Sequence, residues 1–251
     1  MPYRRLPNTD SARIKAMKLA HEKGNEIPPF KLAFSQTMFQ RIKSTLPSFE
    51  NAISEHKNSL NLHADKNKEY QKRLKKAKLY ISHFIQVIDM AIIRGELQAE
   101  IRKYYGLVEV ERKLPSLTTE EEILSVGKSI IEGEKTRRQK GLAPITNPTI
   151  AVVQVHYDKF LDAYNHQKSL KKRSSHAHDV LDSLRSSIDD IIQQTWNEIE
   201  ETYKDLPEEL RREKCMKYGV VYVFRKNELS GINLFQGEQG GVTVSSSQVS
   251  S

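Results

Sequence analysis

The first long pattern of apolar positions predicts a helix that begins near Pro47. Its seam follows the alternating spacing of four and three residues that places side chains on one face of a helix. The seam positions are Phe49, Ile53, His56, Leu60, His63, Asn67, Tyr70, Leu74, Ala77, Ile81, Phe84, Ile88 and Ala91. No glycine or proline interrupts the stretch before Gly95, which favours one continuous helix. The alternative is a hairpin that turns between Asn61 and Asn67, where the seam becomes polar.

A second pattern of the same kind predicts another long helix after Asn147-Pro148. Its apolar seam consists of Val153, Tyr157, Phe160, Tyr164, Leu181, Ile188, Ile192 and Ile199. The centre of this stretch, residues 171–178, is polar, and no glycine or proline follows until Pro207. Two such helices predict a mainly α protein, an elongated helical bundle or coiled coil.

Shorter helices are predicted around these two. One ends at Gly24, and another spans Ser35–Lys43. Between the long patterns, Thr118 and Thr119 are each followed three residues later by a glutamate, which forms two overlapping capping boxes. They predict a connector helix that ends near Gly141.

The ends of the two long patterns resemble each other. Segments 96–110 and 209–223 carry the same residue at seven of fifteen aligned positions. Both contain a Tyr-Gly pair and then a Val-rich run; Gly106 and Gly219 can adopt the left-handed conformation that ends a helix, and valines favour extended chain. Upstream, residues 81–86 match 188–193 after a shift of six residues. We therefore predict an internal duplication of a helix, a turn and a short β-strand, and we expect the two strands after the Tyr-Gly turns to pair.

These elements divide the chain into consecutive segments. They are N-terminal short helices (1–46), a first long-helix repeat (47–110), a connector with a short helix (111–147), a second long-helix repeat (148–224) and a tail (225–251). The tail is rich in Gly, Ser, Gln and Asn and has little to bury, so we expect it to be disordered.

Three parts of the chain carry a resemblance to a known family. They are the opening Met-Pro-Tyr-Arg-Arg-Leu-Pro-Asn-Thr-Asp, the segment Tyr80-Ile-Ser-His-Phe-Ile-Gln with Arg94-Gly-Glu96, and the end Tyr218-Gly-Val-Val-Tyr-Val. Together they resemble a family of bacterial all-helical proteins that has no assigned activity. The resemblance spans nearly the whole chain and implies a bacterial cytoplasmic origin, and it supplies no functional residues.

Composition and charge narrow the partners only coarsely. The formal net charge is +8 and the isoelectric point is near 9.3, which is compatible with nucleic acid, an anionic membrane surface or an acidic protein. A single cysteine and the absence of an apolar stretch behind the N-terminal arginines favour the cytoplasm. The most apolar segment, Leu79–Ile93, is too short and too polar to span a bilayer, so a membrane partner is not expected.

The sequence holds no strong catalytic or metal-binding motif. Gly127-Lys128-Ser129 lacks the preceding glycine and strand of a phosphate-binding loop, so we interpret Gly127 as a close helix contact. The histidines lack the spacing of known metal motifs, and we predict no metal and no cofactor. Lys214 and Lys217 could lower the pKa of Cys215, but no positioned base can be identified, and we interpret this thiol as a bystander.

Basic residues gather near the middle of both long patterns. The candidates for contact with nucleic acid are Lys68, Lys72, Arg73, Lys75, Lys76, Lys171, Lys172 and Arg173. Side by side they would form a positive belt that binds phosphate backbones without sequence preference, and the alternative is a solvated helix surface. Our main hypothesis is a non-enzymatic helical scaffold or protein-interaction protein, with self-association or a protein partner. The alternatives are a nucleic-acid-binding protein that uses this belt and a membrane-associating helical protein.

Overall fold

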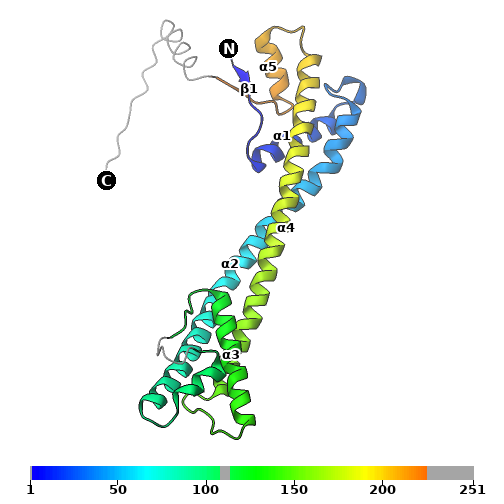
Figure 1. The fold of residues 1–251 in the computed structure, drawn as a ribbon. Coiled ribbons are helices and arrows are strands. Elements are labelled where there is room, and N and C mark those ends of the chain that lie inside the picture. The colour runs from blue at the N-terminus through cyan, green and yellow to red at the C-terminus, as the bar shows by residue number, and fades with distance from the viewer. Residues whose placement is uncertain (1, 108–113, 225–251) are drawn as a thin grey trace, which may run out of the picture. The chain divides into compact units, whose positions relative to one another are not determined.

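The computed structural model of this chain describes residues 2–107 and 114–224. They form a mainly α protein with one small β-sheet (Figure 1). The α-helices are α1 (Asp10–Glu26), α2 (Gln36–Ile93), α3 (Glu120–Gln139), α4 (Ile150–Thr202) and α5 (Glu208–Met216). Short 3-10 helices span η1 (Pro29–Lys31) and η2 (Ala99–Tyr105), and the strands are β1 (Tyr3–Arg4) and β2 (Tyr222–Val223). The strand expected at 108–110 and the tail at 225–251 lie outside the described residues.

Both long helices are continuous, which confirms the single-helix prediction over the hairpin. The start predicted for the first one was wrong, because α2 begins at Gln36 and contains Pro47. A proline inside a helix costs about 3 kcal/mol. Residues on both sides of it lie on one helix face in the same hydrophobic core, and each such buried side chain contributes roughly 1.5–3 kcal/mol. These side chains are Phe39, Ile42, Leu46 and Phe49.

The chain divides into two compact units, and α2 and α4 contribute to both. Unit 1 comprises residues 1–54 and 179–251, and unit 2 comprises residues 55–178. Each unit therefore contains one end of α2 and one end of α4, together with its own short helices.

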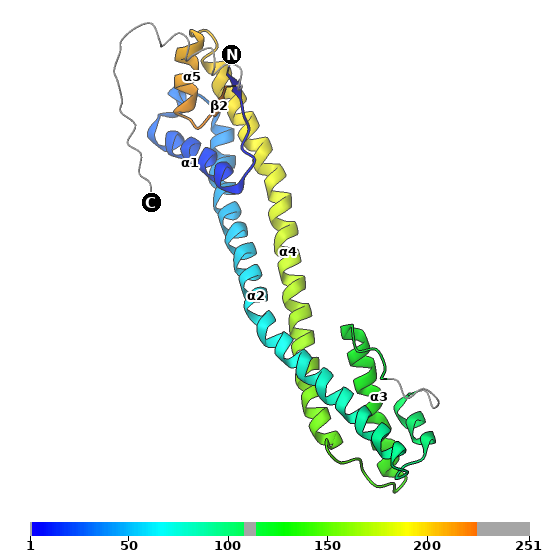
Figure 2. The ribbon, with the colours of Figure 1, turned by 90° about the vertical axis from the view of Figure 1, so that its left-hand side faces the viewer.

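Unit 1 packs α1, α5 and the sheet around its parts of α2 and α4 (Figure 2). Its hydrophobic core includes Met17, Phe49, Ile188 and Trp196, each at most 1% exposed. β2 pairs antiparallel with β1, so that Tyr3 lies opposite Val223. The N-terminal strand thus supplies a hydrogen-bonding partner of β2 within the same unit. The pairing expected between the two repeat strands stays a prediction, because the first of them lies outside the described residues.

Unit 2 packs η2 and α3 against its parts of α2 and α4 (Figure 1). α3 begins with the predicted capping box: the Thr119 side chain accepts from the Glu122 N–H, and Glu122 accepts from the Thr119 N–H. The interpretation of Gly127 as a close helix contact is confirmed, because a Cβ at this position would lie 2.5 Å from the ring of Tyr157 in α4. The phosphate-loop alternative fails because Gly127-Lys128-Ser129 lies inside α3.

Candidate binding site

The basic candidates all belong to unit 2, where most of them are exposed and carry no ion pair. Lys68, Lys72, Lys75 and Lys76 share one face of α2 by their helical spacing. The two arginines differ from them, because Arg73 is paired with Glu69 at 2.5 Å and Arg173 with Glu55 at 2.6 Å. Within the described part of the chain, the lysines of the candidate set form no ion pair, so their charge is available to an external anion.

Only some of these residues line a cavity. A cavity of about 690 Å³ in unit 2 is lined by Lys171 and Lys172 of α4, together with Glu120 and Glu121. Tyr70, also in its wall, donates a hydrogen bond to Glu120. The four α2 lysines are not among its lining residues. The cavity therefore combines part of the basic set with acidic groups that reduce its positive potential.

Two histidine side chains, one from each long helix, lie close together. In unit 2 the rings of His56 and His178 lie 5.4 Å apart between centroids. Throughout residues 2–107 and 114–224, no group of three or more His, Cys, Asp or Glu side chains is placed to hold a metal ion. The pair is a contact between α2 and α4 near the polar centres of their seams.

Cys215 is fully buried in the core of unit 1. Burial raises the pKa of its thiol, so the neighbouring lysines do not activate it.

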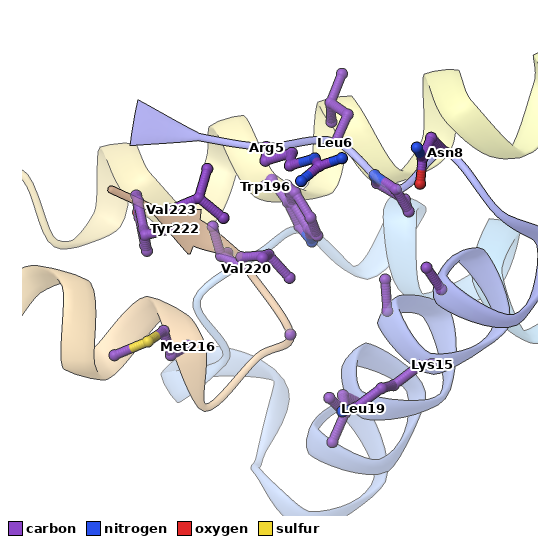
Figure 3. Close-up of a pocket in the computed structure, with 15 residues that line it drawn as sticks. Arg5, Leu6, Asn8, Lys15, Leu19, Trp196, Met216, Val220, Tyr222 and Val223 are labelled. Atoms are coloured by element: carbon purple, nitrogen blue, oxygen red, sulfur yellow. The ribbon is translucent and has the colours of Figure 1, made fainter. Parts of the chain in front are cut away.

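A second cavity, in unit 1, was not foreseen from the sequence. It measures about 530 Å³ and lies among the chain after β1, helix α1, the single tryptophan Trp196 of α4, and the end of α5 with β2 (Figure 3). Its wall is largely apolar and includes Leu6, Leu19, Met216 and Val220. We call this cavity the unit 1 pocket.

Local chain geometry explains how these distant segments meet. Thr9 caps α1 by accepting from the Ala12 N–H at 3.2 Å, and the Arg5 N–H donates to the Val221 carbonyl at 2.9 Å. Gly219 adopts a φ of +95° and lies against α1, where an added Cβ would come within 3.2 Å of the Ala16 carbonyl oxygen. Only glycine suits both the conformation and the space, so Gly219 lets the chain turn into β2 along the pocket.

The charges around the unit 1 pocket are one-sided. Arg5 and Lys15 line it, and within the described range the lining contains no acidic side chain. Two carboxylates close to lining residues are already engaged: Asp10 pairs with Arg185 at 2.7 Å, and Glu200 pairs with Arg4 at 2.9 Å. No ion pair joins Arg5 or Lys15 to any residue that the structure describes.

The hydroxyl of Tyr222, which also lines the pocket, is engaged as well. It donates to the second carboxylate oxygen of Glu200 at 2.6 Å. Burial is the main cause that raises the pKa of this phenol, so it stays protonated at neutral pH. Tyr222 therefore acts as a fixed part of the wall.

The signals for this pocket were present in the sequence but could not be combined. The Tyr-Gly-Val-Val-Tyr-Val run and the N-terminal Tyr-Arg-Arg-Leu-Pro run are each visible as local features. That they lie side by side in the wall of one pocket depends on contacts between residues about 200 positions apart, such as Arg5 with Val221.

No protein-family model, curated protein or solved structure matches this chain. Within the described ranges, no helix combines the length and the apolar character needed to cross a membrane. The candidate sites therefore rest on their own geometry and chemistry.

Proposed function

We propose that this protein is a non-enzymatic binding protein built on a helical scaffold, and that the unit 1 pocket is its ligand site. The observation that carries the proposal is the composition of the pocket wall. It combines apolar side chains, the charged groups of Arg5 and Lys15 and the amide of Asn8. Its volume of about 530 Å³ falls in the range of pockets that hold small ligands.

The same wall offers little for chemistry. Among the described lining residues there is no carboxylate, imidazole, thiol or aliphatic hydroxyl, the groups that most often act as general bases or nucleophiles. The one phenol, Tyr222, is held by Glu200. Binding without conversion of the ligand is the function that this set of groups supports best.

A neutral apolar probe tests the proposal. N-phenyl-1-naphthylamine should bind with saturation and receive excitation energy from Trp196, the only tryptophan of the chain. Ala12→Phe places a large side chain in the pocket wall and should weaken binding about tenfold or more, whereas Ala151→Phe, on an exposed part of α4, should leave it unchanged. Equal binding by both variants would place the probe elsewhere and refute the proposal.

We also propose that the scaffold arose by internal duplication and self-associates through coiled-coil contacts, in a bacterial cytoplasmic protein. Two matched turns support the duplication. Gly106 and Gly219 both have positive φ, and the neighbours nearest to an added Cβ come from α3 in one case and α1 in the other. Light scattering on the eluting size-exclusion peak should give an oligomer, and a mass of 28.9 kDa at all concentrations would contradict self-association.

Nucleic-acid binding is the second candidate, and the unpaired α2 lysines favour it. Binding to DNA or RNA should weaken steeply with salt, because lysines on phosphates release counterions. The test variant changes Lys72, Arg73, Lys75 and Lys76 to Gln. The control removes the same charge by changing exposed lysines outside the set to Gln, namely Lys31, Lys43, Lys57 and Lys135. An equal loss of nucleic-acid affinity in both variants would show that binding depends only on net charge, and it would contradict a binding surface made of the candidate residues.

A further inference from the structure

The charge and shape of the unit 1 pocket point to a class of ligand. We infer that the pocket binds an amphipathic organic anion, a small molecule that carries a carboxylate on an apolar body. This inference rests on the proposed function, because it names the ligand of the same site.

The apolar body of the ligand is inferred from the apolar side chains of the inner pocket wall. Trp196 is only 1% exposed, and Ala16 and Val220 beside it also belong to the core of unit 1. A hydrocarbon chain or ring placed against them loses contact with water, and each buried methylene strengthens binding about fourfold. A small, strongly hydrated ion such as phosphate would gain nothing from this wall.

The negative charge of the ligand is inferred from two basic side chains in the pocket wall and from the absence of an acidic side chain among the described lining residues. Arg5 and Lys15 come from two different segments, the chain after β1 and helix α1, and both side chains are exposed. They therefore border solvent, where a bound carboxylate would also be partly hydrated. Since Asp10 and Glu200 are held by other arginines, neither is free to neutralise these two cations.

The carboxylate itself suits the donors that are present. An arginine guanidinium offers paired N–H groups that match the two carboxylate oxygens, and a lysine ammonium adds a point charge. The side-chain amide of Asn8, also in the wall, is a further donor. A cationic ligand would meet repulsion from both basic residues, and a neutral one would leave them unused.

Matched ten-carbon compounds separate these possibilities in the full-length chain. Decanoate, decan-1-ol and decyltrimethylammonium are titrated while the fluorescence of Trp196 is followed. We expect decanoate to bind at least about tenfold more tightly than decan-1-ol, and the cation to bind more weakly than either. One lost charge-assisted hydrogen bond is enough for a tenfold change.

Variants then assign the preference to named residues. Arg5→Gln with Lys15→Gln should weaken decanoate binding about tenfold or more and leave decan-1-ol binding unchanged. Lys43→Gln removes an exposed lysine of unit 1 that does not line the pocket, and it should change neither. Since Arg5 and Lys15 are exposed, the melting temperature should be retained, and the two single variants, measured separately, should each show part of the loss.

The outcomes distinguish the two proposals. Equal affinity for decanoate and decan-1-ol, with no effect of the double variant, would overturn the anion preference and leave the pocket as a ligand site. Failure of all three compounds and of the neutral naphthylamine probe to bind would overturn the proposed function as well. Decanoate binding that Ala12→Phe does not weaken would place the anion outside the pocket and also overturn the inference.

Discussion

In unit 2 a buried ion pair joins Asp89 of α2 to Arg102 of η2, whereas unit 1 has Trp196 and Cys215 at the positions that align with them. Trp196 aligns with Asp89 when the match of residues 81–86 with 188–193 is extended by three residues, and Cys215 aligns with Arg102 in the segments that end in Tyr-Gly. Arg102, Trp196 and Cys215 are each at most 1% exposed. Similar helix ends are thus filled with charge in one unit and with apolar volume in the other.

A second buried polar cluster is present in unit 2, whereas the aligned part of unit 1 lies in a hydrophobic core. In unit 2, Tyr105 donates to Glu134, and Arg137 donates to Glu134 at 2.8 Å and to Tyr105 at 2.8 Å. In unit 1 the matching Tyr218 packs in the hydrophobic core beside Tyr203. A buried ion pair adds little net stability compared with well-packed apolar groups, but removing one partner leaves an uncompensated charge. Unit 2 should therefore be the more vulnerable to a single substitution.

The largest effect is expected for Arg102→Met, which leaves the carboxyl of Asp89 buried without its partner. We expect a loss of about 3–5 kcal/mol in the free energy of unfolding. Urea denaturation measures the loss, and hydrogen exchange should place it in η2 and α3.

The double variant Asp89→Leu with Arg102→Met places apolar side chains at both positions, as in unit 1. It should recover most of the lost stability, because the carboxylate of Asp89 is then no longer buried without a partner. A double variant as unstable as the single one would show that the two units are not interchangeable in this respect.

The two turn glycines should differ in their tolerance of a side chain. Among the described residues, the Cβ of Gly106→Ala would come no closer than 3.9 Å to a neighbour, Ser129, so the strain of a φ of +69° should cost about 1–2 kcal/mol. Gly219→Ala adds a tight contact of 3.2 Å with the Ala16 carbonyl oxygen of α1 to the strain of its φ of +95°, and roughly 2–4 kcal/mol is expected. Thermal unfolding of the two variants, measured side by side, compares the costs, and equal losses would contradict the close approach at Gly219.

A smaller effect is expected from the ion pair that ties the start of α1 to α4 in unit 1. The hydrogen bond from Arg185 is the main cause that lowers the pKa of Asp10 below its usual 3.8. The fold therefore favours the ionised carboxylate, so this stabilisation is complete above about pH 4 and is lost as the pH falls through the lowered pKa.

Arg185→Gln should cost below about 1 kcal/mol at pH 7, because the pair is partly exposed and screened by solvent. Its difference from the parent chain should shrink as the pH falls below about 4, in unfolding curves recorded from pH 7 to pH 2. Lys43→Gln serves as the control, because Lys43 is exposed and forms no ion pair with a residue that the structure describes. A difference that does not depend on pH would contradict the role of Asp10.

The last prediction concerns the reactivity of the Cys215 thiol, which lies in unit 1 at the position that aligns with Arg102 of unit 2. Because Cys215 is buried and its pKa is raised, a disulfide reagent at pH 8 should label the native chain only very slowly. Labelling in urea should be rapid and complete. Fast labelling of the native chain would show that the end of α5 opens readily.

Much of the helical framework could be predicted from local patterns. The heptad spacing predicted continuous helices through the polar centres of both seams, and Thr119 with Glu122 predicted the start of α3. The left-handed turns at Gly106 and Gly219 followed from their sequence context. The basic set was visible as a cluster of lysines, but which of them would line a cavity was not.

What the sequence determined by itself was therefore the set of elements whose causes are local: helix period, caps and glycine turns, each encoded within a few neighbouring residues. The tertiary structure decided the rest, because these features depend on residues far apart in the chain. The tertiary structure keeps α2 helical at Pro47 by burying the apolar residues before and after this proline in one core, and it pairs β2 with β1. It also joined Asp89 to Arg102 and brought Arg5, Lys15 and Trp196 to one pocket. Burial and charge pairing act between side chains that meet only when the chain is folded, and no local pattern records which ones will meet.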